Sequence, residues 1–172
     1  MKNKKALYIF GIAVLLVVVV IVISLSKNDE KTKASTSLPE ETYPIQGRDH
    51  IVIGAAHDPY NSNPPTSGSH YEQPANWGFY DTELPDEQLV HNLEHGGIWI
   101  SYTGIDEETL SNLKKIAQAY PGSVVVTSRA KNEQKIILAS WGTLKRLTDY
   151  DKDVIIDFIN THKNKSPEPI AK

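Results

Sequence analysis

The sequence of 172 residues contains no cysteine, and its single methionine is Met1. The absence of cysteine excludes disulfide bridges, zinc–thiolate sites, iron–sulfur clusters and cysteine nucleophiles. The lack of any further methionine excludes a thioether copper(I) site. An excess of positive charge is also lacking, because 18 Lys and Arg stand against 21 Asp and Glu, for a formal net charge of −3. Nucleic-acid binding needs a basic surface, so no nucleic-acid partner is expected.

Two common catalytic motifs are missing as well. The chain has neither a G-x-S-x-G nucleophile motif nor a glycine-rich phosphate loop. No organic cofactor is therefore predicted. The hydrophobic fraction of 40% and the three tryptophans exclude wholesale disorder. A chain of this length suits one folded domain of ordinary size.

One long hydrophobic run stands near the amino end of the chain. Residues 6–26 carry no charge and are long enough to cross a bilayer as a helix. Lys2, Lys4 and Lys5 precede the run. The positive-inside rule then places residues 1–5 in the cytoplasm and the rest of the chain outside. A cleaved signal peptide is the alternative, but its apolar region would be shorter. We therefore predict a single-pass cell-membrane protein held by an uncleaved transmembrane helix.

The rest of the chain divides by composition. Residues 27–44 are polar and charged, which predicts a flexible linker. Residues 45–162 have the apolar content of a folded domain, and the predicted orientation makes this domain extracytoplasmic. Residues 163–172 are polar again and contain two prolines, so they are predicted to form a disordered tail.

The first part of the domain is irregular. Residues 50–54 read as a short strand, and residues 57–78 form a long segment rich in proline, glycine, asparagine and serine. A loop of this length inside a compact domain usually has a function. Its aromatic residues, among them Tyr71 and Trp77, favour an ordered loop that packs on the domain.

The second part of the domain is regular. Capping residues and apolar periodicity predict three helices, over residues 85–95, 106–120 and from 149 to about 162. Three strands are predicted, over residues 98–102, 124–126 and 136–138. The first two strands should be parallel, joined by a right-handed crossover through the helix between them. The last two should form a hairpin joined through residues 129–133. The predicted fold is α+β, a small mixed β-sheet with helices packed on it.

Histidines are concentrated in one part of this chain. Five of the six lie between residues 50 and 95, and the sixth is His162. The five are His50, His57, His70, His91 and His95. Imidazole is the commonest transition-metal ligand among side chains, so the concentration indicates a metal site. The alternative is that the histidines hydrogen-bond the long loop to a helix.

The segment 91–95 spells H-x-x-E-H. His91 and His95 are four residues apart, so both imidazoles lie on one face of the predicted helix and can reach one ion. In one class of zinc peptidases Glu94 of this motif would be the general base. Gly96 and Gly97 end the helix at once, however, whereas peptidase sites of this type lie within a continuing helix. A histidine in a last helical turn also interacts well with the helix dipole, which leaves a structural role open.

A proline-stiffened loop supplies another candidate ligand. Pro64 and Pro65 restrict the backbone, and Gly68 permits a turn, which suits holding His70 in one position. An ordinary surface turn is the alternative. His57, at the start of the same loop, is a further candidate ligand.

Two histidine-containing strings resemble a known family. They are PPTSGSH at residues 64–70 and VHNLEHGG at residues 90–97, accompanied by Trp-Gly pairs at residues 77–78 and 141–142. Through them residues 43–160 are similar to the domain of unknown function 3105, a bacterial family whose members often carry one N-terminal membrane span. The family has no established activity. The resemblance implies that His70 and residues 91–97 are features shared by the family.

Three hypotheses of function follow. The first is a membrane-anchored extracytoplasmic domain that binds a divalent transition metal, and imidazole without thiolate suits Zn²⁺ or Cu²⁺. Its candidate ligands are His57, His70, His91, Glu94 and His95. The second is a non-enzymatic module that docks another envelope protein. The third is a metal-dependent hydrolase with Glu94 as general base. Both metal hypotheses require the loop histidines to lie near His91 in space.

Overall fold

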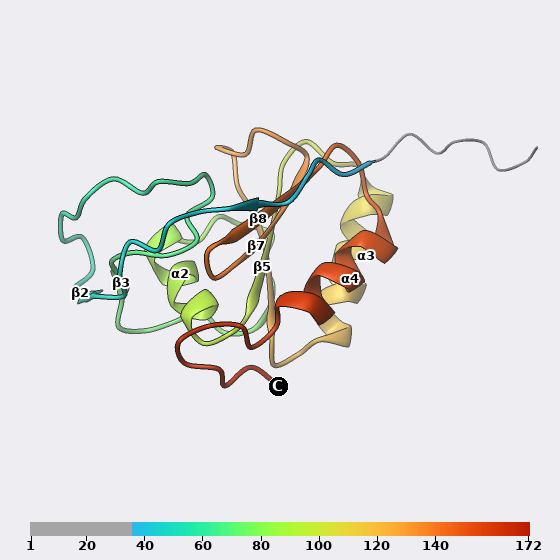
Figure 1. Cartoon of the computed structure of the whole chain (residues 1–172). Coiled ribbons are helices and arrows are strands. Elements are labelled where there is room, and N and C mark those ends of the chain that lie inside the picture. Colours follow the sequence, from blue (N-terminus) through green and yellow to red (C-terminus); the bar gives the residue numbers. More distant parts are fainter. Residues whose placement is uncertain (1–35) are drawn as a thin grey trace, which may run out of the picture. The chain divides into compact units, whose positions relative to one another are not determined.

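A computed structural model describes residues 36–172 (Figure 1). Six strands form one mixed sheet in the order β1-β8-β7-β5-β6-β4, and two more form a separate pair, β2-β3. The strands are β1 (Glu41–Thr42), β2 (His50–Ile51), β3 (His70–Tyr71), β4 (Gly78–Phe79), β5 (Ile98–Tyr102), β6 (Val124–Ser128), β7 (Ile136–Ser140) and β8 (Thr143–Leu147). The helices are α2 (Asp86–Glu94), α3 (Glu107–Ala119) and α4 (Lys152–His162). The predicted α+β class with a mixed sheet is confirmed.

Within residues 36–172, no helix has the length and apolar character needed to cross a membrane. The predicted span at residues 6–26 and the predicted cytoplasmic segment at residues 1–5 lie outside the described part of the chain, as do residues 27–35 of the predicted linker.

The centre of the sheet follows the predicted strand–helix–strand unit. β5 and β6 are parallel, with Ile98 opposite Val124, and α3 connects them. The Asp106 side chain caps α3 by accepting a hydrogen bond from the Thr109 backbone N–H at 2.8 Å. This bond satisfies one of the four backbone donors that a helix start leaves free, which is why the helix begins there.

The predicted hairpin between residues 124–126 and 136–138 is wrong. β5 lies between β6 and β7, and β7 pairs antiparallel with β5 and with β8. Every residue of β5 is buried, so this strand needs a partner on each edge, and β7 provides the second. The hairpin is formed by β7 and β8. β8 was not predicted, because Lys145 and Arg146 interrupt its apolar residues. The last helix begins at Lys152, later than predicted, because Asp151 caps it.

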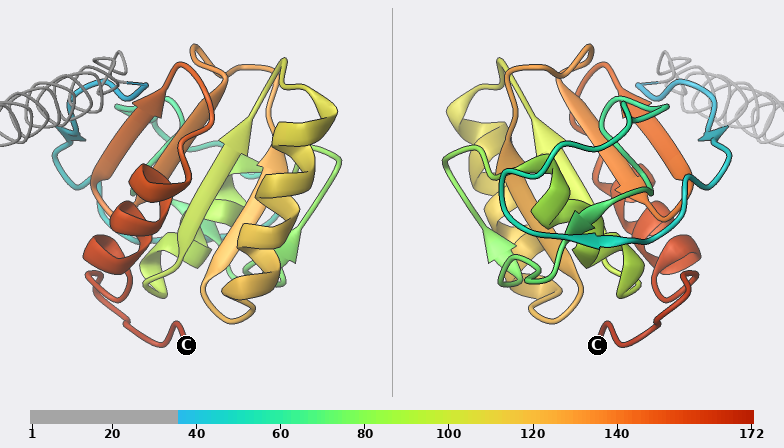
Figure 2. Two further views of the ribbon diagram at one scale, coloured as in Figure 1. Left: turned by 90° about the vertical axis from the view of Figure 1, so that its right-hand side faces the viewer. Right: turned by 90° about the vertical axis from the view of Figure 1, so that its left-hand side faces the viewer.

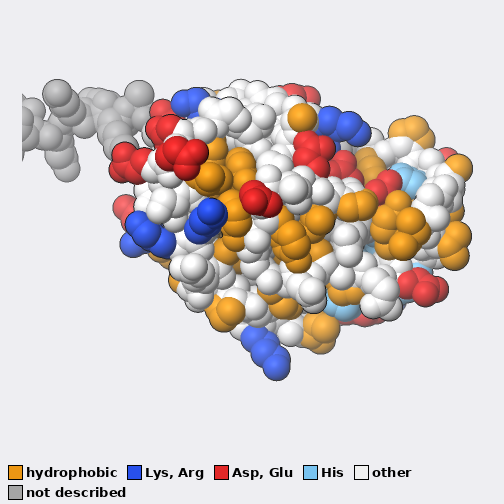
Figure 3. Space-filling view, turned by 180° about the vertical axis from the view of Figure 1, so that it is seen from behind, with side chains coloured by type: hydrophobic (Ala, Val, Ile, Leu, Met, Phe, Trp, Pro, Cys, Tyr) orange, Lys and Arg blue, Asp and Glu red, His pale blue; other side chains and the backbone are white. Residues whose placement is uncertain are grey.

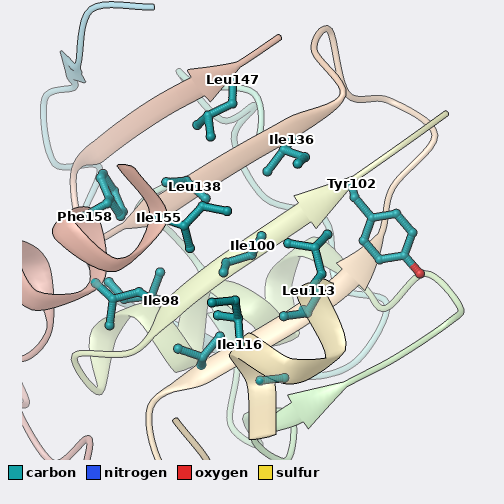
Figure 4. Close-up of a cluster of buried hydrophobic side chains, with 14 residues drawn as sticks. Ile98, Ile100, Tyr102, Leu113, Ile116, Ile136, Leu138, Leu147, Ile155 and Phe158 are labelled. Atoms are coloured by element: carbon teal, nitrogen blue, oxygen red, sulfur yellow. The ribbon is translucent and has the colours of Figure 1, made fainter. Parts of the chain in front are cut away.

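Both faces of the large sheet are covered (Figure 2). On one face, α3 and α4 bury a cluster that includes Ile98, Ile100, Leu138 and Phe158 (Figure 4). On the other face, Leu89 and Leu93 of α2 pack with Trp99, Val125, Ile137 and Leu144. Alternate residues of β5 thus point to opposite faces, as the pleat of a strand requires. α2 is held against the sheet by this second cluster.

Both ends of the described chain pack on the domain, which differs from the predicted linker and tail. Leu38 donates its backbone N–H to the Arg146 carbonyl at 2.8 Å, and β1 continues the sheet beyond β8. At the other end, Asn164 donates to the Gly96 carbonyl at 2.9 Å and Lys172 to the Gly122 carbonyl at 3.0 Å. Residues 36–172 form one compact unit, wider than the predicted 45–162. Polar composition does not report such backbone bonds, since they need no apolar side chain.

Candidate metal centre

The C-terminal half of α2 and its C-cap residue carry three candidate ligands. His91, Glu94 and His95 follow one another at helical spacing, and the Glu94 side chain is only 2% exposed. Asn92, on the adjoining face, exchanges two hydrogen bonds of 2.9 Å with the backbone of Ala75 and so fixes the long loop to the helix. The H-x-x-E-H string therefore combines site residues with a residue that anchors the loop.

The two glycines after His95 permit a close turn. Gly96 adopts φ +81°, a conformation in the left-handed region that glycine tolerates. A Cβ atom on Gly97 would lie 2.3 Å from the Trp77 ring and 2.9 Å from the Asn92 carbonyl. Only glycine lets the chain pass under Trp77 at this point, so the end of α2 is set by packing as well as by local conformation.

The loop before β3 holds His70 in place. Its Gly68 has φ +116° and donates its backbone N–H to the Gly47 carbonyl at 3.0 Å. The Tyr60 hydroxyl donates to the Ser69 carbonyl at 2.6 Å, and burial raises the pKa of this hydroxyl, so it remains a donor. The His70 side chain is completely buried. The proline-rich loop is ordered, as its aromatic residues predicted.

The short parallel sheet brings a further histidine into the site. β2 and β3 pair with His50 opposite His70. The ring centroids of His50, His70 and His91 lie 4.9 to 5.0 Å from one another, so the three imidazoles form a nearly equilateral triangle. One ligand atom from each of these rings and one Glu94 oxygen lie within 4.8 Å of one another. This arrangement of three imidazoles and one carboxylate can hold a metal ion.

Backbone carbonyls orient both buried imidazoles. His70 Nδ1 lies 2.8 Å from the Gly68 carbonyl, and His91 Nδ1 lies 2.6 Å from the Tyr71 carbonyl. A carbonyl oxygen only accepts hydrogen bonds, so each Nδ1 carries the hydrogen. In each ring the other nitrogen, Nε2, is left to face the site. Nδ1 bound to a carbonyl, with Nε2 directed into the site, is the orientation that protein metal sites impose on histidine ligands.

Glu94 is a buried carboxylate that needs a positive partner. Its Oε2 lies 3.0 Å from His70 Nε2 and 3.6 Å from His50 Nε2. Because His70 Nδ1 already carries a hydrogen, a short contact between Nε2 and a carboxylate oxygen requires a shared proton or a cation between them. Burial of an uncompensated carboxylate is costly, so the site favours positive charge at this point.

Burial also favours the unprotonated form of His91. Desolvation lowers its pKa below the ordinary value of 6.5, against the bond to the Tyr71 carbonyl, which raises it. The neighbouring imidazoles of His95, His70 and His50 lower it further. A neutral imidazole has a lone pair on Nε2, which is the form that ligates metals. His91 Nε2 lies 3.1 Å from His95 Nε2, and a neutral His91 with its hydrogen on Nδ1 accepts the hydrogen bond from His95.

His95 points to a second acidic partner. Its Nε2 lies 3.7 Å from a Glu168 carboxylate oxygen, and Glu94, His95 and Glu168 also place ligand atoms within 4.8 Å of one another. Arg48 Nη1 lies 3.2 Å from Glu168 Oε1 and 3.8 Å from Glu94 Oε1. The guanidinium therefore neutralises the outer side of this group, where the side chains are more exposed.

The structure brings together most of the predicted ligands and separates one. His70, His91 and Glu94 meet in the first group, and His95 lies beside them in the second. His57 is not in either group, because its Nε2 lies 3.3 Å from Glu87 and its ring packs on Tyr60. His50 and Glu168 are the residues that the ligand prediction omitted. His50 belonged to the noted histidine concentration, but only its pairing with β3 reveals its role.

The site opens only partly to solvent. His50 is 44% exposed at its side chain, while those of His70 and Glu94 are buried. On the face shown in Figure 3, histidine surface is confined to small areas among hydrophobic and acidic side chains, at the end of the molecule that carries β2 and β3. An ion would enter past His50 and be shielded from water on its inner side.

Comparison with known proteins identifies the family but no activity. No curated protein matches the chain, and no solved structure matches it either. A family model described as protein of unknown function (DUF3105) matches residues 56–172. The match spans His70, all of α2 and Glu168, whereas His50 precedes it. This chain is therefore a member of the DUF3105 family.

Proposed function

We propose that this protein is a membrane-anchored, extracytoplasmic domain that binds a divalent transition metal, Zn²⁺ or Cu²⁺. The ligands are His50, His70, His91 and Glu94. The observation that carries the proposal is the convergence of His70 Nε2 and His50 Nε2 on one oxygen of the buried Glu94 carboxylate, with a ligand atom of His91 within 4.8 Å of the same group. A site built only for structure would have no need to bring the Nε2 atoms of His50 and His70 to the same carboxylate oxygen.

The spacing of the ligand atoms suits a tetrahedral ion. Ligands about 2.0–2.1 Å from zinc lie about 3.3–3.4 Å from one another in a tetrahedron. The distances of Glu94 Oε2 from His70 Nε2 and His50 Nε2, 3.0 and 3.6 Å, fall on either side of that value. Imidazole and carboxylate without thiolate favour Zn²⁺ or Cu²⁺ over Cu⁺. Small side-chain movements would complete the coordination.

The proposed location rests on the sequence. The uncharged residues 6–26 follow three lysines, which supports a single membrane span with the amino end in the cytoplasm. The metal-binding domain would then lie outside the membrane. Neutral imidazoles must be present for metal to bind, so the site would release its ion as the surroundings acidify below about pH 6.

A metal-binding role is favoured over hydrolysis. A general base must be free to activate water, but Glu94 is buried against His70 and belongs to the ligand set. Docking of another envelope protein is the function that would remain if no metal bound.

Metal counting tests the proposal directly. The full chain, purified in detergent without a polyhistidine tag, is dialysed against Zn²⁺ or Cu²⁺, and bound metal is measured by mass spectrometry. We expect at least one tightly bound ion per chain, its loss in His91→Ala, and its retention in His57→Ala, the matched control at a histidine outside the site. Circular dichroism checks that each variant is folded. A folded wild-type chain without metal, or equal metal in both variants, would contradict the proposal.

A further inference from the structure

We infer that Glu94, His95 and Glu168 form a second, more exposed metal site, which shares the Glu94 carboxylate with the first. This inference rests on the proposed function and extends it from one ion to two. The three residues place ligand atoms within 4.8 Å of one another. A carboxylate that bridges two ions is the usual centre of two-metal sites, in which the ions are about 3.5–4 Å apart.

The two oxygens of Glu94 have different surroundings. Oε2 faces the imidazoles of the first site, 3.0 Å from His70 Nε2. Oε1 lies 3.8 Å from Nη1 of the exposed Arg48, and the same guanidinium nitrogen lies 3.2 Å from Glu168 Oε1. Each oxygen of the bridging carboxylate thus has its own set of neighbours, as a bridge between two ions requires.

The C-terminal segment holds Glu168 at the site. Glu168 donates its backbone N–H to the Glu94 carbonyl at 3.2 Å, and Ile170 donates to the His95 carbonyl at 3.1 Å. Asn164 closes the segment by exchanging two hydrogen bonds with the backbone of Ala171, of 2.9 and 3.0 Å. The red segment in Figure 1 follows this course past the end of α2. These bonds keep the Glu168 carboxylate beside His95.

The Arg48 guanidinium supplies the positive charge beside Glu94 and Glu168 that the second ion would otherwise supply. It pairs with both carboxylates, yet its side chain is 55% exposed. Exposed ion pairs contribute little because water screens them, so a divalent cation can displace the guanidinium into solvent at small cost. Arg48 therefore competes with the second ion and keeps the two carboxylates balanced in its absence.

The second site should be the weaker of the two. It offers one imidazole and two carboxylates, and Glu168 is half exposed, whereas the first site has three imidazoles around a buried carboxylate. Metal added in steps should therefore fill the first site and then the second, with the second ion lost first on dilution.

A stepwise zinc titration tests the inference. The full metal-free chain in detergent is equilibrated with rising free Zn²⁺, and bound zinc is counted by mass spectrometry. We expect two equivalents for the wild type and one, of unchanged affinity, for Glu168→Gln. Glu108→Gln, an exposed glutamate on α3, is the matched control and should keep both. His95→Asn should behave as Glu168→Gln does, and Arg48→Gln should tighten the second equivalent about fivefold or less, the range of an exposed ion pair.

The outcomes separate the two proposals. One equivalent in both the wild type and Glu168→Gln would overturn the second site and leave the first intact. Loss of both equivalents in Glu168→Gln would also overturn it, because the residues would then form a single site. No bound zinc in the wild type would overturn the inference together with the proposed function.

Discussion

Substitution of His50 by alanine is the most direct probe of the ligand set. The pairing of β2 with β3 brings His50 into the site. Because its side chain is half exposed, its removal should change the free energy of unfolding little. Loss of partners in the outer shell of a metal site costs 10- to 100-fold in affinity, and we take about 100-fold for a direct ligand. His57→Ala removes a histidine that the structure keeps outside the site.

The expected size of the effect follows from linkage. At a free Zn²⁺ concentration about 100 times the wild-type Kd, binding stabilises the folded domain by about 2.7 kcal/mol. The unit Thr36–Lys172 has 172 − 35 = 137 residues, which gives an unfolding entropy of about 0.29 kcal/mol/K and a rise in Tm of about 9 °C. With a Kd about 100-fold weaker, the same zinc contributes about 0.4 kcal/mol, or about 1.4 °C.

Thermal unfolding of the full chain in detergent, followed by tryptophan fluorescence, measures these shifts. Each protein is melted in a chelator and again in Zn²⁺ at the fixed concentration. The wild type and His57→Ala should both gain about 9 °C, and His50→Ala only 1–2 °C. An equal gain in His50→Ala and the wild type would refute the assignment of His50 as a ligand. If Zn²⁺ did not raise the Tm of His57→Ala, the ligand set drawn from the structure would be refuted.

Three further predictions concern the fold and the site. Because burial lowers the His91 pKa below 6.5, the unfolded chain binds a proton that the folded domain does not, so the metal-free domain should lose stability as the pH falls below about 6.5. Denaturant midpoints between pH 7.5 and 5 measure this, and a flat profile would contradict it. Asn92→Ala leaves two Ala75 backbone groups unpaired and should cost about 1–3 kcal/mol in chemical denaturation. Asn112→Ala, which removes only a solvent-exposed hydrogen bond from Lys115, should cost little. The Trp141 ring lies 6.5 Å from the His70 ring, so Cu²⁺ should quench its fluorescence, and Trp141→Phe should remove most of that quenching.

Local sequence patterns predicted those helices and strands that are stabilised by residues close together in the chain. Asp106 caps α3 because its own side chain meets the Thr109 N–H, and both residues lie within one turn. The run 98–102 is a buried strand because apolar side chains fill both of its faces. The order of strands depends on contacts between distant segments, so the sequence pattern paired residues 124–126 with 136–138 when β5 in fact separates them.

The candidate site shows the same division. His91, Glu94 and His95 could be found from helical spacing, and His70 from the stiff loop that precedes it. His50 and His57 have similar surroundings in the sequence, and nothing local distinguishes the residue that joins the site from the one that pairs with Glu87. Glu168 lies in a polar segment that was predicted to be disordered from its composition. A backbone hydrogen bond to Glu94 of α2 holds it beside the site.

The sequence by itself determined which metal-ligand types are available to this protein. Without cysteine or internal methionine, any transition-metal ligands in this chain would be imidazole and carboxylate, and the spacing of residues 91–95 predicts such side chains on one helix face. Only the tertiary structure decided which distant side chains join that face. The pairing of β2 with β3 brings in His50, and the C-terminal segment brings in Glu168. The reason is physical, since backbone hydrogen bonds between segments far apart in the chain leave no local pattern in residue type.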